Sequence, residues 1–165
     1  MDILEKWNPV ARQFAAKIVH MELTYKSIKD PEGFEAFRTL LKSSGLPADD
    51  LDYQRDLLVG YYEEGSLVGT GGLEVHGGYG LLRSLSVKLG IRGKSVGTAI
   101  TEYLLNQAKE KKLKGIYLLT ETAKGFFEKK GFQVVTRDQV PGEVKSSSEF
   151  SHVCPTSAVV MRLML

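Results

Sequence analysis

The stretch from Leu81 to Ile100 constrains this chain more than any other part of its sequence. An apolar segment typical of a strand leads into a short loop of small residues, and apolar residues at helical spacing follow. The first N–H groups of a helix have no partner within the helix, so a junction of this kind can bind a phosphate. Arg92 and Lys94 add positive charge to the loop. The sequence therefore predicts a site for a ligand that carries a pyrophosphate.

Hydrophobic periodicity predicts a mixed α/β fold around this junction. Strands at 57–62, 67–75 and 81–89, separated by turn residues, form an antiparallel meander. The period changes to that of a helix from Ser95 onward, and a fully apolar strand at 115–120 is typical of a buried, parallel neighbour of 81–89. The other expected elements are a strand at 23–28, a helix that starts at Asp30-Pro31 and ends at Gly45, a short helix at 123–130, and strands at 132–136 and 157–165.

A length of 165 residues is typical of one domain. We expect residues 22–165 to form that domain, and residues 1–21 to form an N-terminal helix or arm. Val10, Phe14 and Ile18 fall at helical spacing there.

Composition narrows the class of protein. The net charge of +2 gives no reason to expect a nucleic acid or a membrane surface as partner. The only cysteine, Cys154, excludes an internal disulfide framework and a cysteine-based zinc site, and we expect it to be a packed residue. We find no apolar run of membrane-spanning length and no secretory signal pattern. We therefore expect a cytoplasmic protein without a metal.

The junction resembles the acetyl-CoA signature of the GCN5-related N-acetyltransferases (GNATs). That signature has Arg or Gln, two residues, Gly, one residue, and then Gly or Ala; here Arg92, Ser95 and Gly97 match it. Ser95 stands where Gly is usual, and a serine adopts positive φ less easily. The segment Ala123–Phe132 resembles the family's helix after the fifth strand. The resemblance implies the GNAT fold, a mostly antiparallel sheet with a splayed central parallel strand pair flanked by helices.

A closer resemblance is to the small acetyltransferases of bacterial arsenic-resistance operons. It rests on Glu74, on 82–85, on 117–120 and on the tail, with Glu149-Phe150, Cys154-Pro155 and Ser157-Ala158. It implies transfer of an acetyl group to the amino group of a small molecule, such as a glutamate-like toxic amino acid with an arsenical or phosphinic group. Homodimers are common in the family.

The resemblance also implies where acetyl-CoA, the cosubstrate, binds. Its pantetheine arm would lie on the backbone of the strand before the signature, and its pyrophosphate on the loop and the helix start. The implied contacts are Leu85, Ser86 and Val87 for the arm, Arg92, Gly93, Lys94, Ser95, Val96, Gly97 and Thr98 for the pyrophosphate, and Phe127 from the following helix.

A base must take the proton of the acceptor ammonium, because only a neutral amine attacks a thioester. Glu74, near the end of its strand, is our candidate, with His76 and Glu121 as alternatives. His76 has a suitable intrinsic pKa but lies in a Gly-rich turn.

The leaving thiolate is often protonated in this family by a Tyr in the helix after the fifth strand. Phe127 occupies that position here and cannot donate a proton. Tyr117 is our candidate for the proton donor, and Ser84 is the alternative.

Five residues are candidates for binding the acceptor. Arg83 can hold an anionic group through a bidentate contact, or it can form a structural ion pair. Ser84, Thr120 and Thr122 lie where the two ligands should meet, and Arg137 is a weaker candidate for the anion.

Two other functions stay open. The same reaction can act on a protein N-terminus or lysine. The replaced Tyr and the serine at position 95 instead favour a CoA-binding sensor without turnover.

Overall fold

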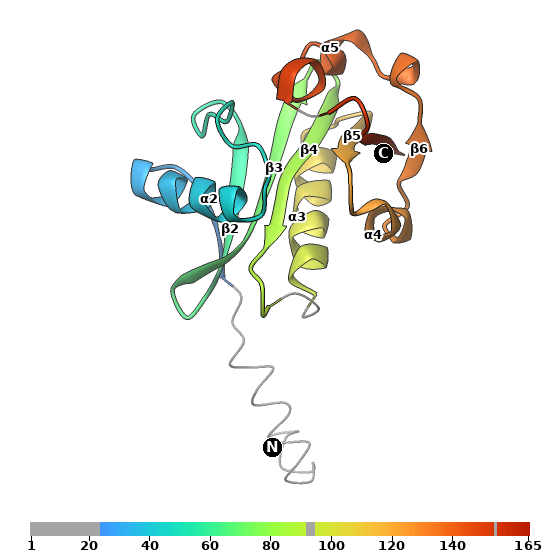
Figure 1. The fold of residues 1–165 in the computed structure, drawn as a ribbon. Coiled ribbons are helices and arrows are strands. Elements are labelled where there is room, and N and C mark those ends of the chain that lie inside the picture. The colour runs from blue at the N-terminus through green and yellow to red at the C-terminus, as the bar shows by residue number, and fades with distance from the viewer. Residues whose placement is uncertain (1–23, 92–94, 154) are drawn as a thin grey trace, which may run out of the picture.

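The computed structural model describes residues 24–91, 95–153 and 155–165, and its strands form one seven-stranded sheet (Figure 1). The order in the sheet is β1-β2-β3-β4-β5-β7-β6. The predicted α/β class with a mixed sheet is confirmed, whereas the arm expected at residues 1–21 lies outside the described residues. The strands are β1 (Thr24–Ser27), β2 (Leu57–Glu63), β3 (Ser66–His76), β4 (Tyr79–Val87), β5 (Gly115–Thr120), β6 (Gln133–Val135) and β7 (Val159–Met164).

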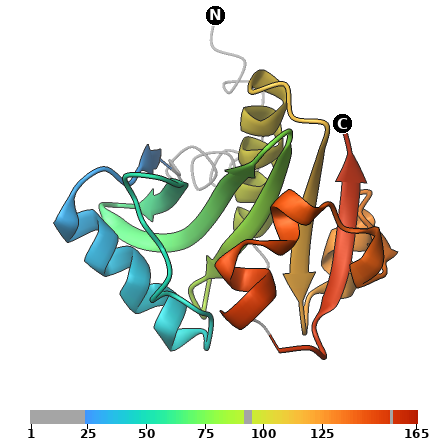
Figure 2. The ribbon, with the colours of Figure 1, turned by 90° about the horizontal axis from the view of Figure 1, so that it is seen from above.

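Helices cover both faces of the sheet (Figure 2). On one face α3 packs against β3 and β4, while α2 and α5 pack on the other. No helix among the described residues combines the length and the apolar character needed to cross a membrane. The helical elements are α2 (Pro31–Ser43), α3 (Val96–Glu110), α4 (Lys124–Lys129), the 3-10 turn η2 (Arg137–Gln139), α5 (Gly142–Lys145) and the π-helical turn η3 (Glu149–Val153).

The expected start of α2 is confirmed. The Asp30 side chain accepts a hydrogen bond from the Gly33 N–H at 2.8 Å, and Pro31 occupies the first turn. Phe37 and Leu41 are fully buried against the sheet, and Gly45 follows the helix with a φ of 70°. The C-terminal end of α2 is thereby fixed above β4.

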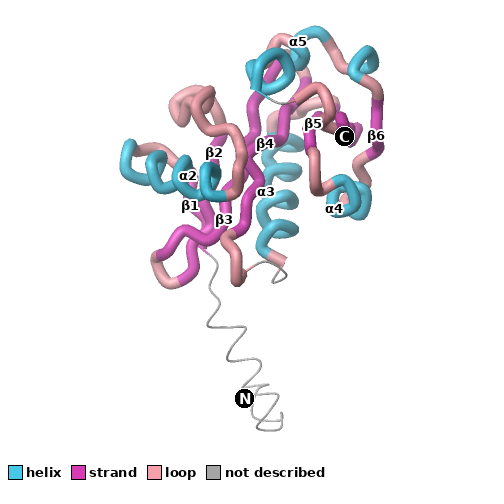
Figure 3. The backbone as a smooth tube through the Cα atoms, viewed as in Figure 1, coloured by secondary structure: helices cyan, strands magenta, loops and turns pink. Residues whose placement is uncertain are grey.

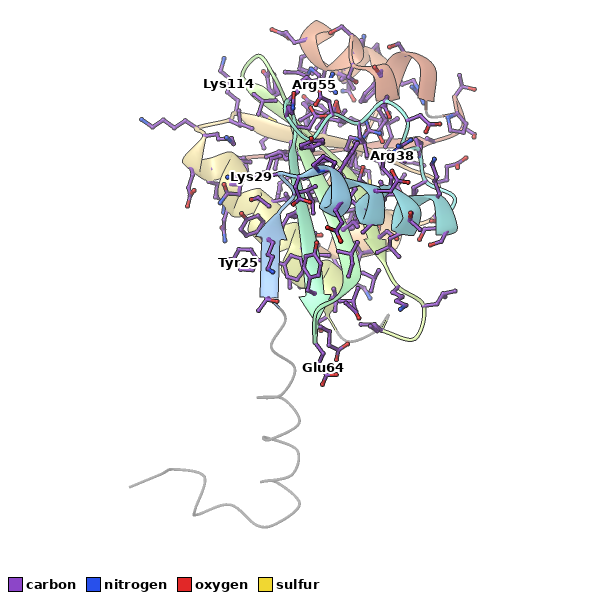
Figure 4. All side chains as sticks on the ribbon, turned by 90° about the vertical axis from the view of Figure 1, so that its left-hand side faces the viewer. Tyr25, Lys29, Arg38, Arg55, Glu64 and Lys114 are labelled. Atoms are coloured by element: carbon purple, nitrogen blue, oxygen red, sulfur yellow. The ribbon has the colours of Figure 1, made fainter. Side chains whose placement is uncertain are left out.

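Tight turns join the strands of the meander (Figure 3). The β2–β3 turn has positive φ at both central residues, 48° at Glu64 and 80° at Gly65, which matches the twist of a hairpin. Figure 4 shows Glu64 at the tip of this hairpin. The hairpin expected between the two strands is confirmed.

Glycine lets α3 lie close to β3. A Cβ atom at Gly71 would lie 2.4 Å from Ile100 Cγ2 and 2.9 Å from Leu104 Cδ1. Both side chains are fully buried. This close packing fixes where α3 begins relative to β4.

The parallel pair of β4 and β5 is short. Its partners are Tyr79 with Gly115, Gly80 with Ile116, and Leu81 with Tyr117. β4 then runs on to Val87 and β5 to Thr120 without further pairing to each other. The splayed central pair expected of the fold is confirmed.

A β-bulge interrupts β4 where the two strands part. Thr70 pairs with Ser86 and Gly72 with Arg83, so β4 carries one extra residue. Ser84 has a φ of 60°, and its carbonyl accepts a hydrogen bond from Thr70 Oγ1 at 2.8 Å. The periodicity of 81–89 predicted a regular strand, because an alternating pattern does not reveal an inserted residue.

The segment after β6 contains three short helical elements, η2, α5 and η3, which are not among the elements expected from the sequence. Val144 and Ser147 are buried in this segment. Turns this short have too few residues for a periodic signal. Their position matters because η3 places Glu149 close enough to interact electrostatically with Arg83 of β4.

Candidate active site

A cavity of about 640 Å³ opens between the parted ends of β4 and β5. Its other walls come from the C-terminal end of α2, the start of α3, α4 and η3. The lining includes Ser44, Gly45, Leu46, Pro47, Arg83, Ser84, Leu85, Ser86, Val87, Gly97, Thr120, Glu121, Thr122, Phe126, Phe127 and Glu149.

The start of α3 borders one end of this cavity. The N–H of Ala99 donates to the Ser95 carbonyl at 3.0 Å, so the N–H groups of Val96, Gly97 and Thr98 have no acceptor within the helix. Ser95 adopts a φ of 63°, the conformation that a serine disfavours, and its side chain makes no capping hydrogen bond. The signature residues Arg92, Gly93 and Lys94 lie outside the described residues.

The strand wall of the cavity includes Leu85, Ser86 and Val87, the residues that the family resemblance implies for the pantetheine contact. Leu85 and Val87 also pack against the core under α3. Ser86 Oγ lies 2.6 Å from Ser44 Oγ, which joins β4 to the end of α2. This wall is therefore braced from both sides.

Aromatic rings form the wall on α4. Phe127 is 4% exposed, and its ring lies 5.0 Å from that of Phe126 and 5.5 Å from that of Phe132, both edge to face. A Cβ atom at Gly97 would lie 3.6 Å from Phe126 Cζ. The cavity is narrow between α3 and α4, and the wall at Phe127 has no hydroxyl.

Arg83 is engaged in a buried ion-pair cluster. Its side chain is 1% exposed, and its guanidinium binds both carboxylate oxygens of Asp50, one of them at 2.8 Å. It also donates to Glu74 Oε2 at 3.3 Å. Its Nε is buried and has no hydrogen-bond partner among the described residues. Of the two roles open for Arg83, the structural ion pair is present.

The pKa values in the cluster follow from these pairs. Burial acts to lower the pKa of Arg83, but its hydrogen bonds to Asp50 and the surrounding negative charges, Glu149 first among them, outweigh burial and raise it. Burial acts to raise the pKa of Asp50, but the hydrogen bond and charge of Arg83 hold it below its ordinary value. Both groups are therefore ionised at neutral pH.

The predicted base, Glu74, lies in this cluster and does not border the cavity. It is 4% exposed, and its other oxygen, Oε1, lies 3.5 Å from His76 Nε2. Tyr117, the predicted proton donor, is 2% exposed and packs edge to face on Tyr79 with ring centres 5.8 Å apart, also away from the lining. The structure thus brings neither side chain to the cavity wall, and their catalytic roles stay predictions.

The remaining candidates lie on or near the wall. Thr120 Oγ1 accepts from the Ala123 N–H at 3.0 Å and so helps to start α4. Thr122 borders the cavity, and the buried Ser84 Oγ has no hydrogen-bond partner among the described residues. The exposed Glu121 accepts from Ser157 Oγ at 3.4 Å. Arg137 instead binds the Pro155 carbonyl at 3.1 Å, and Cys154 lies outside the described residues.

Two parts of the wall were missed by sequence reasoning. The end of α2 contributes Ser44, and η3 contributes Glu149, which is 5% exposed. Both come from segments far from β4 in the chain, so no local pattern placed them there. Glu149 belongs to the tail on which the closer resemblance found in the sequence rests, and this was the one available signal.

The family model of the acetyltransferase (GNAT) domain matches residues 54–134. Its match runs from just before β2 to β6 and so spans β4, β5, the start of α3 and α4. These are the elements that form most of the cavity.

Solved acetyltransferases share the fold. Rv2747 from Mycobacterium tuberculosis, in complex with CoA, has a TM-score of 0.73 at 23% identity, over 86% of this chain and 99% of that one. N-acetylglutamate synthase from Neisseria gonorrhoeae, complexed with coenzyme A and N-acetyl-glutamate, has a TM-score of 0.71 at 13% identity, over 87% of this chain but only 35% of that one.

An aminoglycoside 6'-N-acetyltransferase complexed with coenzyme A has a TM-score of 0.65 at 16% identity, over 86% of this chain and 97% of that one. All three likenesses concern the arrangement of the sheet and its helices. The matched model places a GNAT acetyltransferase domain at residues 54–134, and the three structures show the fold of which it is part.

Proposed function

We propose that this protein is an acetyl-CoA-dependent N-acetyltransferase that acts on the amino group of a small molecule. The observation that carries the proposal is the cavity between the parted strands β4 and β5, which reaches from the buried Arg83 to the start of α3. Similar structures of the fold were solved with coenzyme A.

The residues on the cavity wall suit an acetyl-CoA molecule. The N–H groups at the start of α3, with Arg92 and Lys94 nearby in the chain, would hold the pyrophosphate. The backbone of β4 at 85–87, beyond the residues that pair with β5, would bind the extended pantetheine arm as an added strand does. The acetyl group would then lie near Ser84, at the point where the strands part.

For the acceptor, we propose a glutamate-like amino acid, including its arsenical or phosphinic analogues. The synthase from Neisseria gonorrhoeae was solved with N-acetyl-glutamate, and the buried Nε of Arg83 offers one N–H to an anionic group. Asp50 and Glu74 already bind Nη1 and Nη2 of the guanidinium, so we expect such a group to bind at Nε.

The test is release of free CoA thiol from acetyl-CoA with a panel of amines. Glutamate and its phosphinic and arsenical analogues are compared with glutamine and norvaline, which have no side-chain anion, and with a polyamine, an aminoglycoside and peptides. We expect the anionic amino acids to have a kcat/KM at least about tenfold above norvaline, since a charged hydrogen bond is worth about 1.5–3 kcal/mol. Preference for norvaline or the polyamine would refute the glutamate-like acceptor only, and preference for peptides would favour a protein acceptor.

One observation favours a second function, a CoA-binding sensor. The wall at Phe127 has no hydroxyl to protonate a thiolate. A sensor binds acetyl-CoA and releases no thiol with any amine, so the same assay with calorimetry of acetyl-CoA binding separates the two. A cytoplasmic location and a homodimer stay predictions.

A further inference from the structure

The carboxylates in this part of the molecule differ in whether they border the cavity. Asp50 is bound bidentately by Arg83, and Glu74 lies between Arg83 and His76. Neither of these two carboxylates borders the cavity. Glu121 borders it but is exposed to solvent.

Glu149 is the buried carboxylate of the cavity wall among the described residues. The π-helical turn η3 places it there, with 5% of the residue exposed, on the wall that also includes Arg83 and Ser84. Its charge interacts with that of Arg83. If the acetyl group lies near Ser84, an acceptor amine must come close to this part of the wall.

The charge of the cluster favours a cation. Asp50, Glu74 and Glu149 carry three negative charges when ionised, and Arg83 carries one positive charge, which leaves −2. Since opposite charges attract strongly in a poorly solvated site, an ammonium group is stabilised beside Glu149.

We propose that Glu149 is the catalytic base that binds the acceptor ammonium and takes its proton, an inference that rests on the proposed function. One N–H proton passes to the Glu149 carboxylate, and the nitrogen lone pair attacks the thioester carbonyl carbon. The C–N bond forms and the C–S bond breaks. The second N–H proton goes to the leaving thiolate sulfur, which yields the amide and the free thiol, and Glu149 releases its proton to solvent.

The test compares two acceptors in wild type and in Glu149→Gln. One is the amine with the highest kcat/KM in the panel, which is an ammonium ion at neutral pH. The other is hydroxylamine, which is already neutral there. We expect Glu149→Gln to lower kcat/KM about 100-fold or more for the ammonium acceptor, the range of general base catalysis, and by only a few-fold for hydroxylamine. The dissociation constant of acetyl-CoA should stay within about twofold, because Glu149 acts at the acceptor.

Glu143→Gln is the matched control. Glu143 is a carboxylate in the neighbouring helix α5, exposed and outside the cavity lining, so its neutralisation should leave both rates unchanged. Glu149→Ala supplies a second measurement, because formate added to it should restore part of the rate if a carboxylate is needed at this place. Thermal unfolding of each variant checks that the fold is kept.

Several outcomes would overturn the inference. They are an equal loss with both acceptors, a loss of acetyl-CoA affinity, no loss at all, and no rescue by formate in a folded Glu149→Ala. A wild type that acetylates no amine would instead refute the proposed function itself.

Discussion

Two serines adopt the left-handed conformation at the cavity, Ser84 in the bulge of β4 and Ser95 before α3. A side chain in this conformation is strained by about 1–2 kcal/mol, and glycine avoids that strain. The family signature has glycine at the second of these positions, so the backbone conformation is kept here even though the residue is not. The strain at Ser95 lowers the stability of the fold locally. The sequence alone indicated it, because a serine stands there where glycine is usual.

We predict that Ser95→Gly raises the free energy of unfolding by about 0.5–1 kcal/mol, since the relieved strain exceeds the added freedom of the unfolded chain. No capping hydrogen bond is lost, because the Ser95 side chain makes none. Urea unfolding measures the change. Ser95→Ala, which keeps the strain, should not be more stable than wild type, and a Ser95→Gly protein less stable than Ser95→Ala would contradict the explanation.

At the same scale, the ionisation of Asp50 makes the free energy of unfolding depend on pH. Arg83 holds the pKa of Asp50 below its ordinary value of 3.8, so the contribution of this pair is complete above that pH and is lost as the pH falls through the lower, folded-state pKa. We predict that Asp50→Asn lowers the free energy of unfolding at neutral pH by about 2–3 kcal/mol. The difference from wild type should shrink below about pH 4.

Asp49→Asn is the control for Asp50. The Asp49 side chain is 85% exposed and forms a surface pair with Arg38 at 2.9 Å, so its loss should cost no more than about 0.5–1 kcal/mol. Urea unfolding at several pH values measures both variants. Equal effects of the two substitutions would show that the Arg83 pair contributes no more than a surface pair.

At the scale of elements, the contact of α3 with β3 depends on glycine. We predict that Gly71→Ala destabilises the protein by about 1–3 kcal/mol, because the new methyl group would overlap with Ile100 and Leu104 in a packed core. Gly125→Ala is the same change within α4, where nothing lies within 4 Å, and it should stabilise by about 0.5–1 kcal/mol. Thermal unfolding of the pair should therefore give shifts of opposite sign; shifts of the same sign would refute this account of the packing.

Local patterns explain why most elements could be predicted. Asp30-Pro31 at the start of α2, the Glu64-Gly65 turn and the apolar run of β5 each depend on a few consecutive residues. The pair of Asp50 and Arg83 joins residues 33 apart in the chain, and the bulge at Ser84 depends on the partner strand β3. No window of sequence contains both sides of such contacts, so the cluster around Arg83 and the place of Glu149 needed the structure.

On the scale of the whole molecule, the cavity lies between two halves of one sheet, and a ligand there contacts both. We predict that acetyl-CoA at about 100 times its dissociation constant raises the free energy of unfolding by about 2.7 kcal/mol. In Gly97→Val this increase should be lost, because the added side chain would enter the narrow space beside Phe126. Denaturant unfolding with and without acetyl-CoA measures the increase in the free energy of unfolding. A Gly97→Val protein that acetyl-CoA still stabilises fully would contradict the proposed position of acetyl-CoA between α3 and α4.

The short pairing of β4 with β5 has a consequence for the protein without ligand. Beyond Leu81, β4 and β5 no longer pair with each other, so the sheet is open at its centre. Open strand edges recruit other chains and promote aggregation. A bound pantetheine arm would cover this edge, and preparations without cosubstrate should therefore lose soluble protein faster on storage than preparations that contain it.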